Sequence, residues 1–111
     1  MNKDFRTDHL NGATKTVADS ITAFMATHNG EAPSGGGCTA FYSPEAWADR
    51  GESYGTDSVL VLCHDGGDLA PFCNLDYCDY DRFEALVAHL GTLGYWVEGC
   101  TSWYSAVYPV A

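Results

Sequence analysis

The stretch from His64 to Asp81, HDGGDLAPFCNLDYCDYD, concentrates side chains that can do chemistry. It holds five aspartates, two cysteines and one histidine, and a single arginine, Arg82, follows it. Such a set fits three kinds of site: a metal centre, a nucleophilic active site, or a negatively charged surface that meets a positively charged partner.

The spacing of the possible ligands argues against a metal centre. Zinc prefers cysteine and histidine ligands in short, regular spacings, of which C-x₂-C is the commonest element. Here Cys63 and His64 are adjacent, so a strand would point them to opposite faces. Four residues separate Cys73 from Cys78. The aspartates between them lack the length and alternation of an EF-hand loop. We therefore expect neither a metal ion nor another cofactor.

A nucleophilic site would need a thiol held beside a histidine and an acid. The chain supplies all three types of residue, but it has no motif such as G-x-S-x-G. Neighbouring carboxylates would also make a thiol less reactive. We expect His64 to sit beside Asp65 or Asp68 in a turn, and His89 to lie on the exposed side of the last helix. A small Cys/His-dependent enzyme remains the alternative to a binding protein.

An acidic recognition surface accounts best for the same stretch. Two tyrosines alternate with aspartates in LDYCDYD, and tyrosine supplies contact area with a polar tip. Carboxylates and aromatic rings together suit a partner that is rich in arginine and lysine. The residues that we expect to contact this partner are Asp65, Asp68, Asp76, Tyr77, Asp79, Tyr80, Asp81 and Glu84.

The distribution of charge supports this interpretation. Fifteen acids and five bases give the chain a net charge of −10. Residues 45–84 hold ten acids and two bases, so −8 of that charge falls in the central part of the chain. Such a field repels nucleic acids and anionic membrane surfaces and attracts basic protein surfaces. We therefore expect a basic protein partner, with no direct contact to nucleic acid or membrane.

The hydrophobic pattern predicts a single α+β domain over residues 1–111. Apolar residues at helical spacing predict long helices at 13–28 and 80–93. Ser43, Pro44 and Glu45 start a short helix that should end near Arg50, with Trp47 anchored in the core. The unbroken run at 58–63 is typical of a strand covered on both faces. Further strands are expected at 38–42, 69–75, 95–98 and 103–110.

Consecutive hairpins among these strands favour a mainly antiparallel sheet of about five strands, with the two main helices and the short one packed on one side. The strand at 69–75 would pair with 58–63 through a turn at Gly66 and Gly67. Pro71 cannot donate a ladder hydrogen bond, so this strand should lie at an edge or carry a bulge.

The start of the chain and its cysteines indicate a cytoplasmic protein with reduced thiols. The N-terminal residues lack the apolar run of a signal peptide, and no stretch reaches the ~20 apolar residues of a membrane span. The five cysteines lie mostly in apolar runs, where cysteine behaves as a small hydrophobe. Dense aromatic residues near the C-terminus leave both a monomer and a homodimer open, and a dimeric structural module is a further alternative.

In size and charge the whole chain resembles the small acidic proteins that phages and plasmids carry against host defence, namely anti-CRISPR proteins and DNA-mimicking anti-restriction proteins. The resemblance rests on general character and not on a motif. It implies a non-catalytic inhibitor whose partner is a CRISPR effector or a restriction nuclease, acting in the host cytoplasm.

Overall fold

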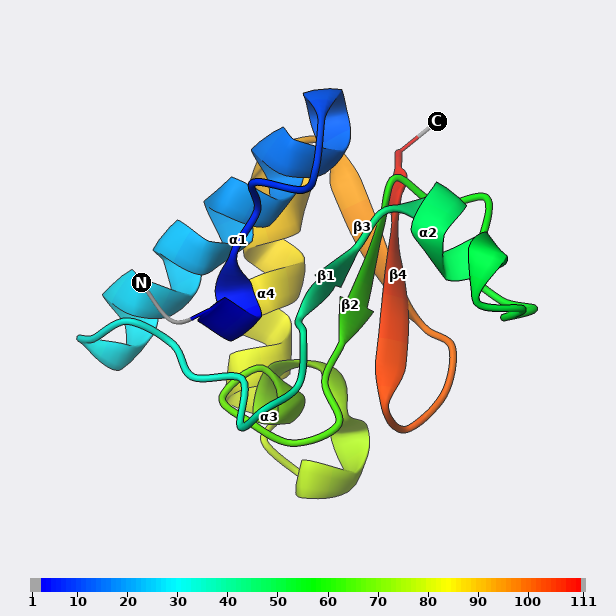
Figure 1. The fold of residues 1–111 in the computed structure, drawn as a ribbon. Helices are drawn as coiled ribbons and strands as arrows, with labels where there is room; N and C mark the ends of the chain where they lie inside the picture. The colour runs from blue at the N-terminus through cyan, green and yellow to red at the C-terminus, as the bar shows by residue number, and fades with distance from the viewer. Residues whose placement is uncertain (1–2, 111) are drawn as a thin grey trace.

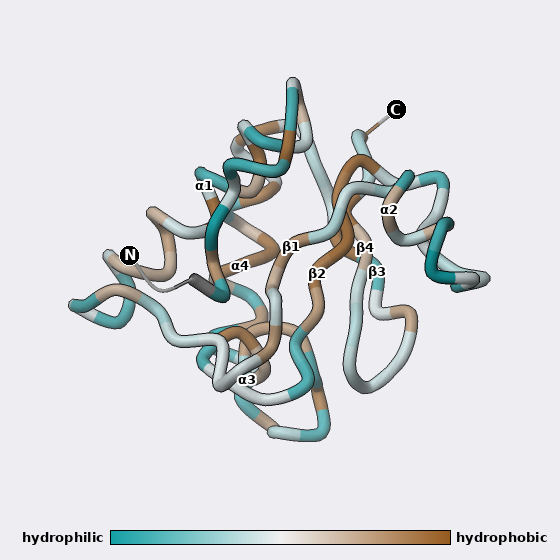
Figure 2. Tube along the Cα trace, in the orientation of Figure 1, coloured by the Kyte–Doolittle hydropathy of each residue, from teal (hydrophilic) through white to brown (hydrophobic). Residues whose placement is uncertain are grey.

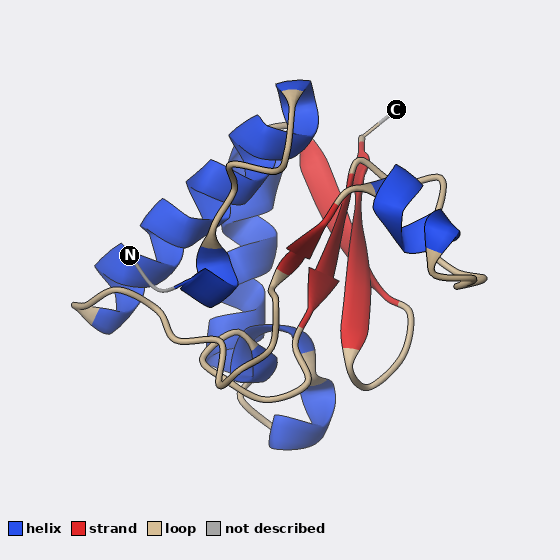
Figure 3. Ribbon diagram, in the orientation of Figure 1, coloured by secondary structure: helices blue, strands red, loops and turns tan. Residues whose placement is uncertain are grey.

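The computed structural model describes residues 3–110 as an antiparallel sheet with helices on both faces (Figures 1 and 3). The sheet has four strands in the order β1-β2-β4-β3, and every neighbouring pair is antiparallel. The helical elements are η1 (Lys3–Phe5), α1 (Gly12–Asn29), α2 (Pro44–Asp49), α3 (Ala70–Cys73), η2 (Leu75–Tyr77) and α4 (Tyr80–Thr92). The strands are β1 (Phe41–Tyr42), β2 (Leu60–Cys63), β3 (Tyr95–Gly99) and β4 (Tyr104–Pro109).

The α+β class and the predominantly antiparallel sheet are therefore confirmed, with four strands where about five were expected. Among residues 3–110, none of the helices combines the length and the apolar character that crossing a membrane requires.

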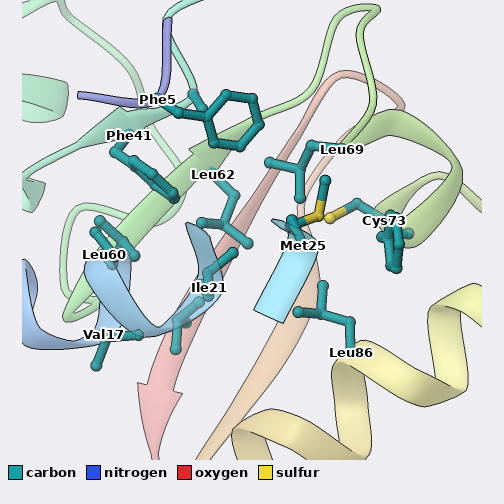
Figure 4. Packing of buried hydrophobic residues seen from close by; sticks show 14 of the residues in the cluster. Phe5, Val17, Ile21, Met25, Phe41, Leu60, Leu62, Leu69, Cys73 and Leu86 are labelled. Atoms are coloured by element: carbon teal, nitrogen blue, oxygen red, sulfur yellow. The ribbon is translucent and has the colours of Figure 1, made fainter. Parts of the chain in front are cut away.

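The main core lies between the sheet and the two long helices. Side chains of α1 (Val17, Ile21, Met25) and of α4 (Leu86, Leu90) pack on Leu60 and Leu62 of β2 (Figure 4). These positions recur at the helical period that the sequence displays. Figure 2 shows the resulting contrast between hydrophobic central strands and hydrophilic surface loops.

The short helix α2 packs on the opposite face of the sheet, so the expectation that all helices share one side is wrong. Trp47 is fully buried against Val61 and Tyr104. Val61 alternates with Leu60 and Leu62 along β2 and therefore points to the other face. Every residue of β2 is buried as a result, which confirms a strand covered on both faces. Ser43 caps α2 by accepting a hydrogen bond from the Ala46 amide at 3.1 Å.

The segment expected to be a fifth strand, 69–75, is helical instead. The Asn74 amide donates to the Ala70 carbonyl at 2.8 Å, which closes a helical turn. Pro71 lies in the first turn of α3, where its missing amide costs no hydrogen bond. The buried residues Leu69, Ala70, Phe72 and Cys73 follow a helical spacing rather than strict alternation. The glycines at 66 and 67 do take positive φ, but they lead into this helix and not into a returning strand.

Candidate functional site

The predicted contact residues lie between the end of β2 and the first turns of α4, at the end of the molecule occupied by α3 and η2 (Figure 1). We call residues 75–81 the acidic turn. It exposes three large side chains: Leu75 at 49%, Tyr77 at 52% and Tyr80 at 58%. Asp76 and Asp81 are exposed beside them. Apolar, aromatic and acidic groups are thus presented together to solvent.

Short-range hydrogen bonds hold the acidic turn. Asn74 Oδ1 accepts from the Asp76 amide at 3.0 Å, and the Cys78 amide donates to the Leu75 carbonyl at 2.9 Å. Cys78 adopts a left-handed conformation with φ 56°, the one such non-glycine residue within 3–110. A residue in this region is uncommon outside glycine and asparagine. Cys78 is the C-cap of η2, and α4 begins two residues later.

Two of the predicted contact carboxylates have structural roles. Asp79 caps α4, accepting from the Arg82 amide at 3.2 Å, and it also binds the Arg82 guanidinium. These contacts with Arg82 hold the pKa of Asp79 below its usual value. Asp68 accepts from the Ser34 amide at 2.9 Å and so ties the glycine-rich loop to the start of α3. Both residues are therefore poor positions at which to test binding alone.

The eight predicted residues do not form one continuous cluster. Asp76, Tyr77, Tyr80, Asp81 and Glu84 are exposed on the acidic turn and the following helical turn. Asp68 lines a polar hollow of about 450 Å³ together with His28, Glu31 and Arg82. Asp65 is exposed but lines a different hollow, next to two cysteines.

That second hollow has a volume of about 420 Å³ and opens beside the ends of β1 and β2. The sulfurs of Cys38 and Cys63 are 3.2 Å apart in its wall, and the Cys38 thiol also lies 3.6 Å from the Cys63 carbonyl oxygen. Burial, and then the neighbouring Cys38 thiol, raise the pKa of Cys63 to about 12. The other lining residues are Gly36, Gly37, Thr39, Tyr42, Arg50, Asp65 and Trp103. We call this site the thiol hollow.

His64 does not serve either cysteine of the thiol hollow. It is 1% exposed, on the other face of the sheet, and its Nε2 is paired with the Ser105 hydroxyl at 2.9 Å. Its Nδ1 is buried with no hydrogen-bond partner among residues 3–110. Burial lowers the pKa of His64 to about 4. The expectation that His64 sits beside Asp65 or Asp68 in a polar turn is therefore wrong, because β2 carries it into the interior.

The other residues considered for chemistry are also dispersed. His89 is half-buried, paired with the Ser20 hydroxyl at 2.8 Å and stacked on Phe24, and is not on an exposed helix face. Cys73 is buried in the main core, whereas Cys78 is exposed. Within the described chain, no three histidine, cysteine or acidic side chains come together as a metal site would require.

The C-terminal aromatic residues divide between core and surface. Trp103 and Tyr104 pack on Trp47, with ring centroids 5.7 and 4.8 Å away. Trp96 stacks on Tyr108 across β3 and β4 at 5.1 Å and remains 42% exposed. Most of these C-terminal rings therefore already pack against other aromatic rings of the chain.

The chain matches no family model, no curated protein and no solved structure. Sequence reasoning missed the thiol hollow, because 25 positions separate Cys38 from Cys63 and no local spacing links them. The antiparallel pairing of β1 with β2 is what brings them together.

Proposed function

We propose that this protein is a non-catalytic inhibitor that binds the basic surface of a nucleic-acid-binding protein, in the manner of anti-CRISPR or anti-restriction proteins. The observation that carries the proposal is the acidic turn. Tyr77 and Tyr80 are more than half exposed there, although tyrosine in a globular protein usually buries much of its ring. Exposed aromatic groups that are flanked by carboxylates fit a contact surface better than they fit a solvated loop.

The mechanism follows from charge. A nuclease or its guide complex holds nucleic acid through lysine and arginine side chains, and carboxylates on a folded domain compete for the same cations. The net charge of −10 steers the protein towards such a surface and speeds the encounter. Tyr77 and Tyr80 add area and can stack on arginine guanidinium groups. Binding of this kind weakens as the salt concentration rises.

The proposal is tested by reversing charges on the acidic turn without disturbing the cap of α4. The double variant Asp76→Lys/Asp81→Lys keeps Asp79 and therefore keeps the bond to the Arg82 amide. The matched control is Asp8→Lys/Asp49→Lys, which changes two exposed carboxylates elsewhere. Each substitution adds two charge units to −10, so both variants carry −6. The comparison thus separates position from total charge.

Inhibition of DNA binding is measured for a panel of purified CRISPR effectors and restriction nucleases at two salt concentrations. Against the sensitive enzyme, the Asp76→Lys/Asp81→Lys variant should lose affinity by about tenfold or more, because attractive pairs become repulsive. The control should lose little. Tyr77→Ala/Tyr80→Ala should weaken inhibition while leaving its salt dependence unchanged. Equal inhibition by the two lysine variants would contradict the acidic turn as the contact, and no inhibition across the panel would contradict the function.

A further inference from the structure

The thiol hollow contains a pair of cysteines that no part of the proposed inhibitory function uses. Cys63 is the last residue of β2, and its amide donates to the Ala40 carbonyl at 2.8 Å. Cys38 lies in the loop that leads into β1, in a turn closed by its own amide and the Gly35 carbonyl. The ladder therefore fixes Cys63, whereas Cys38 approaches it from a loop that follows three glycines.

We propose that Cys38 and Cys63 form a redox-active dithiol that is oxidised to an intramolecular disulfide by a low-molecular-weight disulfide entering the thiol hollow. The sulfurs are already 3.2 Å apart. A disulfide bond has a length of about 2.04 Å, so closure needs a further approach of about 1.2 Å. No other pair of the five cysteines is in sulfur–sulfur contact within residues 3–110.

The exposure of the two thiols assigns their roles. Cys38 is half-buried and lines the hollow, so it meets the incoming disulfide first. Cys63 also lines the hollow but is only 7% exposed, and burial raises the pKa of its thiol, so it is the less reactive of the two. Cys38 is then the attacking thiol and Cys63 the resolving one.

The reaction takes two exchange steps. The Cys38 thiolate attacks one sulfur of the small disulfide, forms a mixed disulfide and releases the first small thiol. Cys63 loses its proton and attacks the Cys38 sulfur, which forms the Cys38–Cys63 bond and releases the second small thiol. The two protein thiols are oxidised by two electrons, the small disulfide is reduced by two electrons, and the two protons end on the released thiols.

The lining of the thiol hollow suits an amino-acid-derived disulfide. Arg50 and Asp65 place one positive and one negative group at its wall. The Arg50 guanidinium lies over the Trp47 and Tyr42 rings, 4.5 and 5.2 Å from their centroids, and pairs with the Glu52 carboxylate at 3.4 Å, so its orientation is constrained. The Arg50 guanidinium and the Asp65 carboxylate complement the carboxylate and ammonium groups that such a disulfide carries.

The test uses the full chain and glutathione disulfide as the probe. After incubation and rapid alkylation, intact mass and peptide mapping should find a Cys38–Cys63 linked peptide and the loss of two hydrogens. The Cys63→Ser variant should stop at a mixed disulfide, with one glutathionyl group on Cys38. The Cys38→Ser variant should leave Cys63 reduced over the same time. Cys73→Ser, which removes a buried thiol outside the hollow, should form the same disulfide as the wild type.

Two outcomes would overturn the proposal. One is a wild-type protein in which Cys38 keeps a glutathionyl group without linking to Cys63. The other is a protein in which Cys38 and Cys63 both stay reduced while the exposed Cys78 reacts, since this would mean that the hollow does not admit the reagent. Circular dichroism of each variant, recorded first, establishes that the altered thiol and not the fold accounts for the result.

Discussion

The backbones of Gly35 and Gly67 pack directly against each other. A Cβ atom placed on Gly67 would lie 2.5 Å from the carbonyl carbon of Gly35 and 2.6 Å from its oxygen. The contact joins the loop before β1 to the turn before α3, two segments that also share the bond from the Ser34 amide to Asp68. It thereby sets the path of the loop that carries Cys38.

Gly67→Ala should therefore destabilise the fold strongly. Gly67 has φ +76°, so alanine there is conformationally strained and also collides with backbone that cannot yield. We expect a loss of roughly 2–5 kcal/mol in the free energy of unfolding, from strain and overpacking together. Gly66→Ala is the matched control, because φ is +98° but nothing lies within 4 Å of its added methyl group. It should cost only about 1–2 kcal/mol. Equal urea midpoints for the two variants would contradict the packing argument.

The buried His64 should make the fold less stable in mild acid. Burial lowers its pKa from 6.5 to about 4, so between these values the folded protein binds fewer protons than the unfolded chain. The free energy of unfolding therefore rises with pH through this window. The contribution of His64 is fully present above about pH 6.5 and is lost as the pH falls towards 4. Over the step from pH 8 to pH 5 this contribution is about 2 kcal/mol.

The variant His64→Gln isolates that effect, because glutamine can pair with the Ser105 hydroxyl but does not titrate. The free energy of unfolding of both proteins is measured by urea at pH 8 and at pH 5. The loss of this free energy between pH 8 and pH 5 should be about 2 kcal/mol smaller for the variant. An unchanged pH dependence would mean that His64 titrates normally, and hence that it reaches solvent in the folded state.

The protein should sediment as a monomer at micromolar concentration. The Trp96 and Tyr108 rings already stack on each other, and Tyr104 is buried on Trp47, so the C-terminal hairpin exposes one large aromatic ring, that of Trp96 at 42%, which is little area for a dimer interface. The net charge of −10 further opposes self-association. Sedimentation velocity over a concentration series decides the point. A dimer that dissociates in the Trp96→Ser variant would locate an interface on the β3–β4 hairpin and contradict this expectation.

Local patterns were enough to predict most of the elements. The helices α1 and α4 follow from apolar spacing, and Ser43 caps α2 at the start that the sequence predicts. The buried strand β2 follows from an unbroken apolar run. Each of these features depends on residues within a few positions of one another, which is the range over which helical period, capping and strand propensity act.

The segment 69–75 shows where local patterns fail. Its apolar residues fit either a strand or a helical turn, and a short apolar run does not distinguish the two. Packing decided the matter: Phe72 and Leu69 reach the main core together only from a helical turn, next to Phe24 of α1. Pro71 is consistent with that turn, although the sequence alone suggested an edge strand.

The sequence by itself determined the composition of the site: an acidic chain, an aspartate- and tyrosine-rich segment before the last helix, and a strand buried on both faces. Tertiary structure alone decided which groups meet. The pairing of β1 with β2 puts the sulfur of Cys38 beside that of Cys63, and the contact of Gly35 with Gly67 positions the loop that carries Cys38. The packing of the sheet and its helices buries His64. These contacts join residues 25 to 41 positions apart, and no local pattern encodes them because they form only when the whole sheet and its helices have packed.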